Sequence, residues 1–286
     1  MSAKFSTTQT ALAVAAPAPD KVVVNGEAVA NSGYLAYHRQ RIAATMEAMG
    51  RIGASRVVEL GAHPWAMTAL LVDDPRFEIL ATVSAEEVTN WPDDIAVGAR
   101  TCDITTARGN RARFINYSAN LERTLFYIEE RPDTIAACEI IEHMIRSPHI
   151  MLLNINHWLP IGGNLILTTP NGAQFSNPFR RKSHSPAYRC NAYERHAFLY
   201  TRKELVDIIS LCGFHVIESG YWDVYTRSGP GFLLDAVSGL PGIYFKDKFK
   251  KTIYCIARKS DDIQTLSRPP LIYDPRGKWE FIEPRS

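Results

Sequence analysis

Apolar and polar positions along this chain follow two periodicities, one typical of helices and one typical of buried strands. Apolar residues at helical spacing predict helices over 35–53, 65–71, 147–160 and 201–214. Short β-branched or continuous apolar runs predict strands at 56–60, 77–83, 112–117, 133–141, 164–169, 215–222 and 252–259. Because strands and helices alternate, the expected fold class is α/β, Rossmann-like, with a doubly wound and mostly parallel sheet.

The start of the helix at 201–214 is the most specific local signal in the chain. Thr201 precedes the first helical residue, and Glu204 follows three residues later, which is the pattern of a capping box. A Cys-Gly pair stands at the other end of the same segment, where a glycine often ends a helix. Both boundaries of this helix are therefore predicted from local sequence.

The same patterning divides the 286 residues into one domain with two flanking segments. Residues 31–260 carry the alternating elements and form the predicted domain. Residues 1–30 begin with small residues and prolines and predict a disordered or extended leader, with a weak signal peptide as the minor alternative. Residues 261–286 predict an extended tail, and the long polar stretch at 172–195 predicts a functional loop.

Composition narrows the classes of function. Hydrophobic residues make up 46% of the chain and charged residues 22%, as in an ordinary globular protein. The net charge of +2 disfavours nucleic acid or a membrane surface as partner, and no apolar run is long enough for a transmembrane helix. The five cysteines match no zinc-binding spacing, and cysteines in apolar stretches predict a reducing, cytoplasmic location. A homodimer is compatible with this composition.

Candidate chemistry gathers at the carboxyl ends of predicted strands, where open α/β sheets bind their ligands. One strand ends in Glu59, followed closely by Gly61, and another runs into Glu139, Glu142 and His143. A carboxylate at the end of an apolar strand is costly to bury unless it is paired or bound to a metal. Two carboxylates and an imidazole can ligate a divalent ion, so a metal site and a salt-bridged strand end both stay open.

Four segments taken together resemble the class I S-adenosylmethionine-dependent methyltransferases. They are RVVELGAHPWAMTALL, PDTIAACEIIEHM, LPIGGNLILTTPN and RHAFLYTRKELVDIISLCGFHVI, and the resemblance extends from about residue 33 to about residue 259. The first loop is also similar to that of O-methyltransferases from polysaccharide and natural-product gene clusters. The resemblance implies a seven-stranded sheet with a reversed last strand.

This resemblance also implies a cofactor site for S-adenosylmethionine. The residues it assigns to that site are Glu59, Gly61, Ala62, His63, Ser84, Asn120 and Glu139. The sequence departs from the family pattern in two places. Ala62, His63 and a proline replace further glycines, and Ser84 stands where a ribose-binding acid is expected. Either Glu86 or Glu87 is the alternative for that acid.

A narrower resemblance connects the chain to the small-RNA 3′-terminal 2′-O-methyltransferases, in which two Glu and two His hold a divalent ion. Carried over, the ligands of an Mg- or Mn-type ion are Glu139, Glu142, His143 and His196. A bound metal ion would lower the pKa of a hydroxyl acceptor and fix its direction. Without a metal, His143 or His196 is the candidate catalytic base. Relatives that bind no metal also carry residues of this pattern, so both alternatives stay open.

The sequence thus predicts an enzyme, an S-adenosylmethionine-dependent O-methyltransferase. The expected acceptor is a hydroxyl, in a vicinal diol, on a sugar of a glycan, glycolipid or natural product. The nearly balanced charge favours this acceptor over RNA, whose 3′-end 2′-O-methylation is the alternative, because phosphate binding needs a basic surface. A second alternative is a non-catalytic binding subunit with a methyltransferase-like fold, because the first loop is altered.

Overall fold

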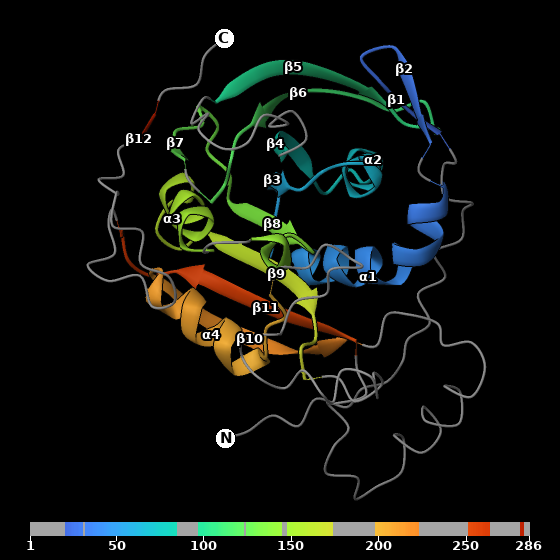
Figure 1. Cartoon of the computed structure of the whole chain (residues 1–286). Coiled ribbons are helices and arrows are strands. Elements are labelled where there is room, and N and C mark those ends of the chain that lie inside the picture. Colours follow the sequence, from blue (N-terminus) through green and yellow to red (C-terminus); the bar gives the residue numbers. More distant parts are fainter. Residues whose placement is uncertain are drawn as a thin grey trace, which may run out of the picture.

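A computed structural model describes most of the predicted domain and part of each flanking segment. The described residues are 21–30, 32–84, 97–122, 124–144, 148–173, 198–222, 251–263 and 281–282. Figure 1 shows one large twisted sheet with helices packed on both of its faces. No helix among these residues is both long and apolar enough to cross a bilayer.

The large sheet holds ten of the described strands in the order β10-β11-β9-β8-β3-β4-β6-β5-β1-β2. Its strands are β1 (Lys21–Val24), β2 (Glu27–Ala30), β3 (Arg56–Leu60), β4 (Glu78–Ser84), β5 (Gly98–Thr105), β6 (Arg111–Ser118), β8 (Thr134–Cys138), β9 (Asn164–Pro170), β10 (Phe214–Trp222) and β11 (Thr252–Lys259). The helices are α1 (Ser32–Arg51), α2 (Ala66–Asp73), α3 (His149–Trp158) and α4 (Arg202–Leu211), with a 3₁₀ turn η1 (Ile141–His143). A small second sheet pairs β7 (Leu125–Phe126) with β12 (Phe281–Ile282).

The predicted Rossmann-like architecture is confirmed in the centre of this sheet. Strands β6, β4, β3, β8 and β9 run parallel to one another. Strand β11, the last of the seven predicted strands, pairs antiparallel with both β9 and β10. The strand order β6-β4-β3-β8-β9-β11-β10 therefore contains the predicted seven strands and the reversed last strand.

Three strands that the sequence analysis did not predict extend the sheet beyond β6, so a count of seven is too low for the described sheet. Strand β5 has exposed residues at half of its positions and no apolar run that would reveal it. Residues 21–30, which belong to the predicted leader segment, form the β1–β2 hairpin, and β1 pairs with β5. Asn25 and Gly26 make its turn with positive φ angles of 51° and 86°, as a tight hairpin requires.

Two hydrophobic clusters, one on each face of the sheet, explain why strands and helices alternate. The side chains of α3 and α4 pack with Ile135 and its same-face neighbours. On the other face, α1 and α2 pack with Ala136 and Cys138, and with Cys102 and Phe114 from the strands of the extension. Because successive residues of one strand enter opposite clusters, both faces must be covered, which accounts for the near-continuous apolar runs in the sequence.

The capping box predicted at the start of α4 is present. The Thr201 hydroxyl accepts the backbone N–H of Glu204 at 3.3 Å, and the Glu204 carboxylate accepts the backbone N–H of Thr201 at 2.9 Å. Two backbone donors at the helix start are thereby satisfied. The apolar side of the helix, with Leu205 and Ile208, is then held against the sheet.

Replacement of the cap should lower stability without altering the fold. We expect Thr201→Ala to reduce the free energy of unfolding by about 1 kcal/mol, because a backbone donor loses its partner. Urea unfolding followed by circular dichroism measures the change. The matched control is Ser210→Ala, which removes an exposed hydroxyl from the same helix and should leave stability nearly unchanged. Equal effects of the two variants would contradict the role of the cap.

Candidate functional site

The candidate site begins at the carboxyl end of β3, where the strand order of the sheet reverses. From β3 the sheet continues through β4 and β6 on one side and through β8 and β9 on the other. Ligands of open α/β sheets bind in the crevice at such a switch point. The chain leaves β3 through Gly61, whose φ is 73° and whose N–H donates to the Val83 carbonyl at 2.8 Å. This positive φ is the reason why the turn favours glycine at this position.

Glu59 is a buried carboxyl group directly before this turn. Its residue is 3% exposed, and the Thr68 hydroxyl donates to its Oε2 at 2.5 Å. Burial raises the pKa of Glu59 to about 8, although the Thr68 hydrogen bond and the charge of Arg41 both act to lower it. Near neutral pH the carboxyl group therefore holds a proton until a positive charge comes close.

Arg41 of helix α1 is the residue of this site that the sequence analysis missed. Its guanidinium Nη2 donates to the Tyr34 hydroxyl at 3.0 Å, and the residue is 2% exposed. It carries a positive charge that lowers the pKa of both Glu59 and Glu142. Arg41 ends the polar run His38-Arg39-Gln40-Arg41, so nothing in the sequence distinguished it from an arginine on the exposed side of the helix.

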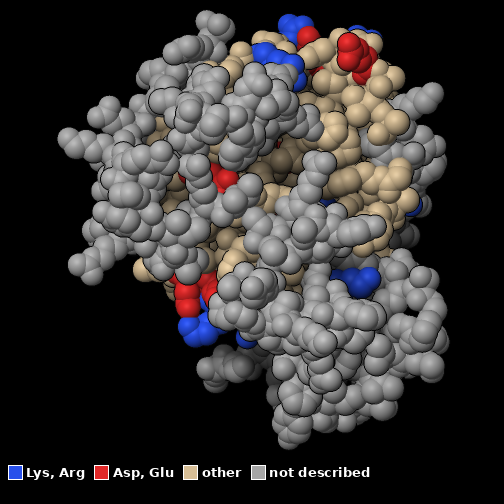
Figure 2. Space-filling model, in the orientation of Figure 1, with Lys and Arg blue, Asp and Glu red and all other residues tan. Residues whose placement is uncertain are grey.

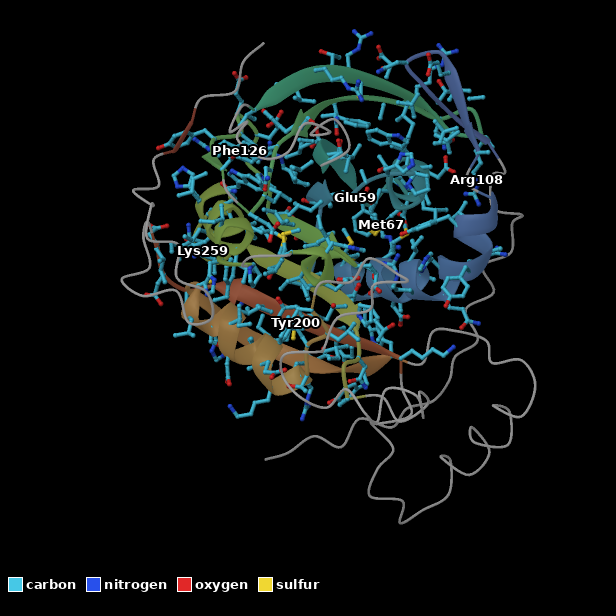
Figure 3. All side chains as sticks on the ribbon, viewed as in Figure 1. Glu59, Met67, Arg108, Phe126, Tyr200 and Lys259 are labelled. Atoms are coloured by element: carbon cyan, nitrogen blue, oxygen red, sulfur yellow. The ribbon has the colours of Figure 1, made fainter. Side chains whose placement is uncertain are left out.

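A narrow cavity joins these groups. It is lined by Tyr34, Arg41, Ile42, Glu59, Gly61, Ala62, His63, Ala66, Met67 and Cys138. Figure 3 shows two of them, Glu59 and Met67, near one another where α2 covers the sheet. The cavity has room for about 10 Å³, the space of roughly one water molecule. A larger ligand can enter only if side chains that line the cavity move.

The cavity brings together four of the residues predicted to bind the cofactor, namely Glu59, Gly61, Ala62 and His63. Ser84 instead lies at the end of β4, where its hydroxyl accepts from Asn116 Nδ2 at 3.2 Å. Asn120 has a local role, because its side chain accepts the backbone N–H of Glu122 at 3.0 Å and closes a turn. The alternatives Glu86 and Glu87 lie outside the described residues.

A second group of predicted residues follows β8. Glu139 has a positive φ of 55° and accepts from the Thr168 hydroxyl at 2.9 Å. Glu142 is fully buried, and its Oε2 accepts from the Thr169 hydroxyl at 3.0 Å. Burial, followed by the nearby charge of Glu139, raises the pKa of Glu142 well above its usual range.

His143 stands next to the buried carboxyl group of Glu142. Its Nε2 lies 4.0 Å from Glu142 Oε1, and the histidine side chain is 42% exposed while that of Glu142 is 0% exposed. The buried carboxyl group lies beside one ring nitrogen, while the exposed part of the imidazole is accessible to a bound molecule. This pair can therefore accept a proton from a bound molecule.

The predicted metal set is described only in part. His196 lies outside the described residues, so the structure does not place all four predicted ligands. Within the described ranges, no three His, Cys, Asp or Glu side chains are arranged to hold a metal ion. Glu139, Glu142 and His143 alone therefore form no such cluster. No metal-dependent step follows from these contacts.

Comparisons with known proteins concern the fold. No family model matches the chain, and no curated protein matches its sequence. A putative methyltransferase of Haloferax volcanii, solved with a methyltransferase activator, is 14% identical over 81% of this chain and 94% of that chain, with a TM-score of 0.49. The N-methyltransferase NodS of Bradyrhizobium japonicum, in complex with S-adenosylhomocysteine, is 12% identical over 78% and 87%, with a TM-score of 0.44. A putative methyltransferase of Bacillus halodurans is 12% identical over 77% and 99%, with a TM-score of 0.48. Likeness at this level carries no assignment of activity.

The raised pKa of Glu59 should make stability depend on pH. In the unfolded chain this carboxyl group ionises near 4.5, whereas in the folded chain it ionises near 8. The folded state thus binds more protons between these values, and its contribution to stability falls as pH rises through that window. We expect Glu59→Gln to flatten the decline in unfolding free energy between about pH 5 and pH 8. Urea titrations over that range measure the slope.

The control for this experiment is Glu78→Gln, which replaces an exposed acid at the start of the neighbouring strand β4. It should leave the slope between pH 5 and pH 8 close to that of the wild type. An unchanged slope in Glu59→Gln as well would show that this carboxyl group ionises normally in the folded protein. It would also remove the reason to expect a positively charged ligand beside it.

Proposed function

We propose that this chain is an S-adenosylmethionine-dependent O-methyltransferase that acts on a sugar hydroxyl in a vicinal diol of a glycan, glycolipid or natural product. The observation that carries the proposal is the buried Glu59 beside the open turn at Gly61, at the switch point of a Rossmann-like sheet. The four sequence segments that resemble class I methyltransferases support the same assignment.

The polar groups around the cavity fit the charges of this cofactor. Its amino-acid part carries an ammonium and a carboxylate, and its sulfur is positively charged. The Glu59 carboxyl group can lose its proton to pair with a positive group, while Arg41 and Tyr34 can donate to a carboxylate. These three side chains would hold the cofactor's amino-acid end. Bound S-adenosylmethionine would supply an activated methyl group.

The acceptor would bind near His143. Transfer of a methyl group to a hydroxyl forms a carbon–oxygen bond, breaks the carbon–sulfur bond and releases the hydroxyl proton. His143 is exposed enough to receive that proton, and its Nε2 lies 4.0 Å from Oε1 of the buried Glu142. Alignment of oxygen, carbon and sulfur supplies most of the remaining rate enhancement, because the methyl group is already activated.

The metal-assisted form of this reaction stays part of the proposal as a prediction from sequence. Glu139, Glu142, His143 and His196 would be the ligands. In the described contacts, Glu139 and Glu142 each accept a threonine hydroxyl instead. A chelator distinguishes the metal-assisted form from the form in which His143 acts as a base without a metal.

A sugar acceptor is favoured over RNA by the distribution of charge. On the face shown in Figure 2, the visible Lys and Arg side chains of the described residues are scattered, and those at the top and at the lower left lie close to Asp or Glu side chains. RNA binding usually relies on a continuous basic stripe to contact phosphates. The net charge of +2 agrees with this interpretation. The other alternative is a non-catalytic subunit, which would not bind the cofactor. Titration with S-adenosylhomocysteine distinguishes it from the proposed enzyme.

Calorimetric titration with S-adenosylhomocysteine tests the cofactor assignment. We expect one-to-one binding with a dissociation constant in the micromolar range or tighter. Arg41→Met should weaken this binding at least tenfold, because a carboxylate loses a charged donor. Methylthioadenosine lacks that carboxylate, and its affinity should be nearly unchanged by the same substitution.

Arg51→Met is the matched control for that titration, because Arg51 is an exposed arginine near the end of the same helix. It should bind S-adenosylhomocysteine as the wild type does. If folded wild-type protein binds no S-adenosylhomocysteine, the methyltransferase proposal fails and the non-catalytic subunit is favoured instead.

Substitution of His143 tests the base. We expect His143→Ala to lower kcat by 100-fold or more while S-adenosylhomocysteine affinity stays the same, since the imidazole acts on the acceptor. The acceptor is first found by screening diol-containing sugars with labelled S-adenosylmethionine. The control is His157→Ala, which changes a histidine near the carboxyl end of α3 and should keep activity. An unchanged kcat in His143→Ala would contradict the role of His143 as a base. In a separate assay of the wild type, loss of activity in excess chelator would support the metal-assisted form.

A further inference from the structure

A second cavity lies at the edge of the sheet opposite to Glu59. It forms where α3 ends and where β8 and β9 begin, so it faces the amino ends of the parallel strands. Its volume is about 420 Å³, whereas the cavity beside Glu59 has about 10 Å³. Clefts of this size are typical of small-molecule sites. Both ligands of the proposed function would bind at the carboxyl ends of the strands, so that function leaves this cavity unused.

Lys259 contributes a buried ammonium group to the wall of this cavity. It is the last residue of β11, and Figure 3 shows it beside α3. Its side chain is 4% exposed, and its Nζ donates to the Leu159 carbonyl at 2.8 Å and pairs with Asp262 Oδ1 at 2.5 Å. The Asp262 side chain is 72% exposed, so water weakens this ion pair. An ammonium group has three N–H donors, and the described residues engage two of them, so Lys259 retains one donor.

Arg131 supplies a second positive charge from the segment that precedes β8. It is exposed at the cavity, and among the described residues no hydrogen bond or ion pair engages its guanidinium group. Asp262 is the one acidic side chain among the described residues that line the cavity. Because Arg131 and Lys259 are far apart in the sequence, only the fold brings their charges to one cavity.

The pKa of His157, which also lines the cavity, shows the sign of the local charge. Burial lowers this pKa, and the charges of Lys259 and Arg131 lower it further, while Asp262 raises it and is the smallest of these causes. The two cations therefore act more strongly on this part of the wall than the acid does. A cavity with an excess of positive charge attracts anions.

Apolar surface lies next to these charges. Ile161 lines the cavity and is 56% exposed. The exposed ring of Tyr127 packs edge-on against His157, with the ring centroids 4.6 Å apart. Charged and apolar groups side by side suit a ligand that has a charged end and an apolar body.

We propose that this cavity binds a small organic anion, whose phosphate or carboxylate group contacts Arg131 and the remaining donor of Lys259 while its apolar part lies against Ile161. A guanidinium group can donate two parallel hydrogen bonds to either kind of anionic group. His157 lies in the wall and is assigned no contact with the anion. This site is separate from the catalytic edge and goes beyond the proposed function.

Calorimetric titration with phenyl phosphate and with benzoate tests the chemistry of the site. We expect at least one of them to bind with a dissociation constant below about 1 mM, and the tighter one identifies the anionic group. Benzyl alcohol lacks the charge, whereas inorganic phosphate and acetate lack the ring. All three should bind at least tenfold more weakly than the tighter aromatic anion. Equal affinity for benzyl alcohol, or binding of neither aromatic anion, would overturn the inference.

Substitution of Arg131 locates the binding. We expect Arg131→Met to weaken binding of the tighter aromatic anion at least tenfold, because a charged donor is lost. Its melting temperature should stay close to that of the wild type, since no described residue pairs with this guanidinium group. Lys259→Met should also weaken binding, but with a lower melting temperature, because the Leu159 carbonyl loses its donor.

Arg111→Met is the matched control, because Arg111 is an exposed arginine at the start of β6, on the other side of β3 from the cavity. It should bind the aromatic anion as the wild type does. Protein saturated with S-adenosylhomocysteine should bind it equally well, since the two sites lie at opposite edges of the sheet. Wild-type affinity in Arg131→Met, or loss of anion binding in the presence of S-adenosylhomocysteine, would overturn the inference while the proposed function stands. Failure to bind S-adenosylhomocysteine would overturn the proposed function alone, because the titrations of Arg131→Met need no cofactor.

Discussion

Burial of carboxyl groups at the carboxyl ends of β3 and β8 is the constraint on which the site depends. Glu59 is 3% exposed and Glu142 is 0% exposed, so neither can rely on water to stabilise a charge. Each receives one threonine hydroxyl, and the charge of Arg41 favours the ionised form of both. Because Arg41 belongs to α1, the packing of that helix on the sheet also sets the electrostatics of the site.

This arrangement gives the site two distinct halves along one edge of the sheet. Around Glu59 and Arg41, opposite charges can receive a ligand that carries both an ammonium and a carboxylate. Beyond β8, His143 is accessible and is supported by a buried carboxyl group, which suits proton transfer from an acceptor. Gly61 joins the strand to the loop in the left-handed backbone conformation, with a φ of 73°.

Local signals in the sequence were sufficient for most elements but not for the edge of the sheet. The capping box at Thr201 and the apolar runs of the central strands each depend on nearby residues, and the structure has all of them. Strand β5 was missed because its residues alternate in exposure and form no apolar run. The β1–β2 hairpin was missed although Asn25 and Gly26 form a strong turn signal, because the segment was interpreted as part of a leader by its composition.

The sequence by itself determined the α/β class, the central parallel strands, the place of Glu59 near the end of a strand, and the place of Gly61, Glu142 and His143 in the segments that follow strands, because periodicity and chain order encode these features locally. Only the tertiary structure decided that Arg41 lines the same cavity as Glu59 and that Ser84 lies beside Ser118. Such relations depend on register and helix packing between distant segments. They follow from burial of the whole sheet, which no short stretch of sequence specifies.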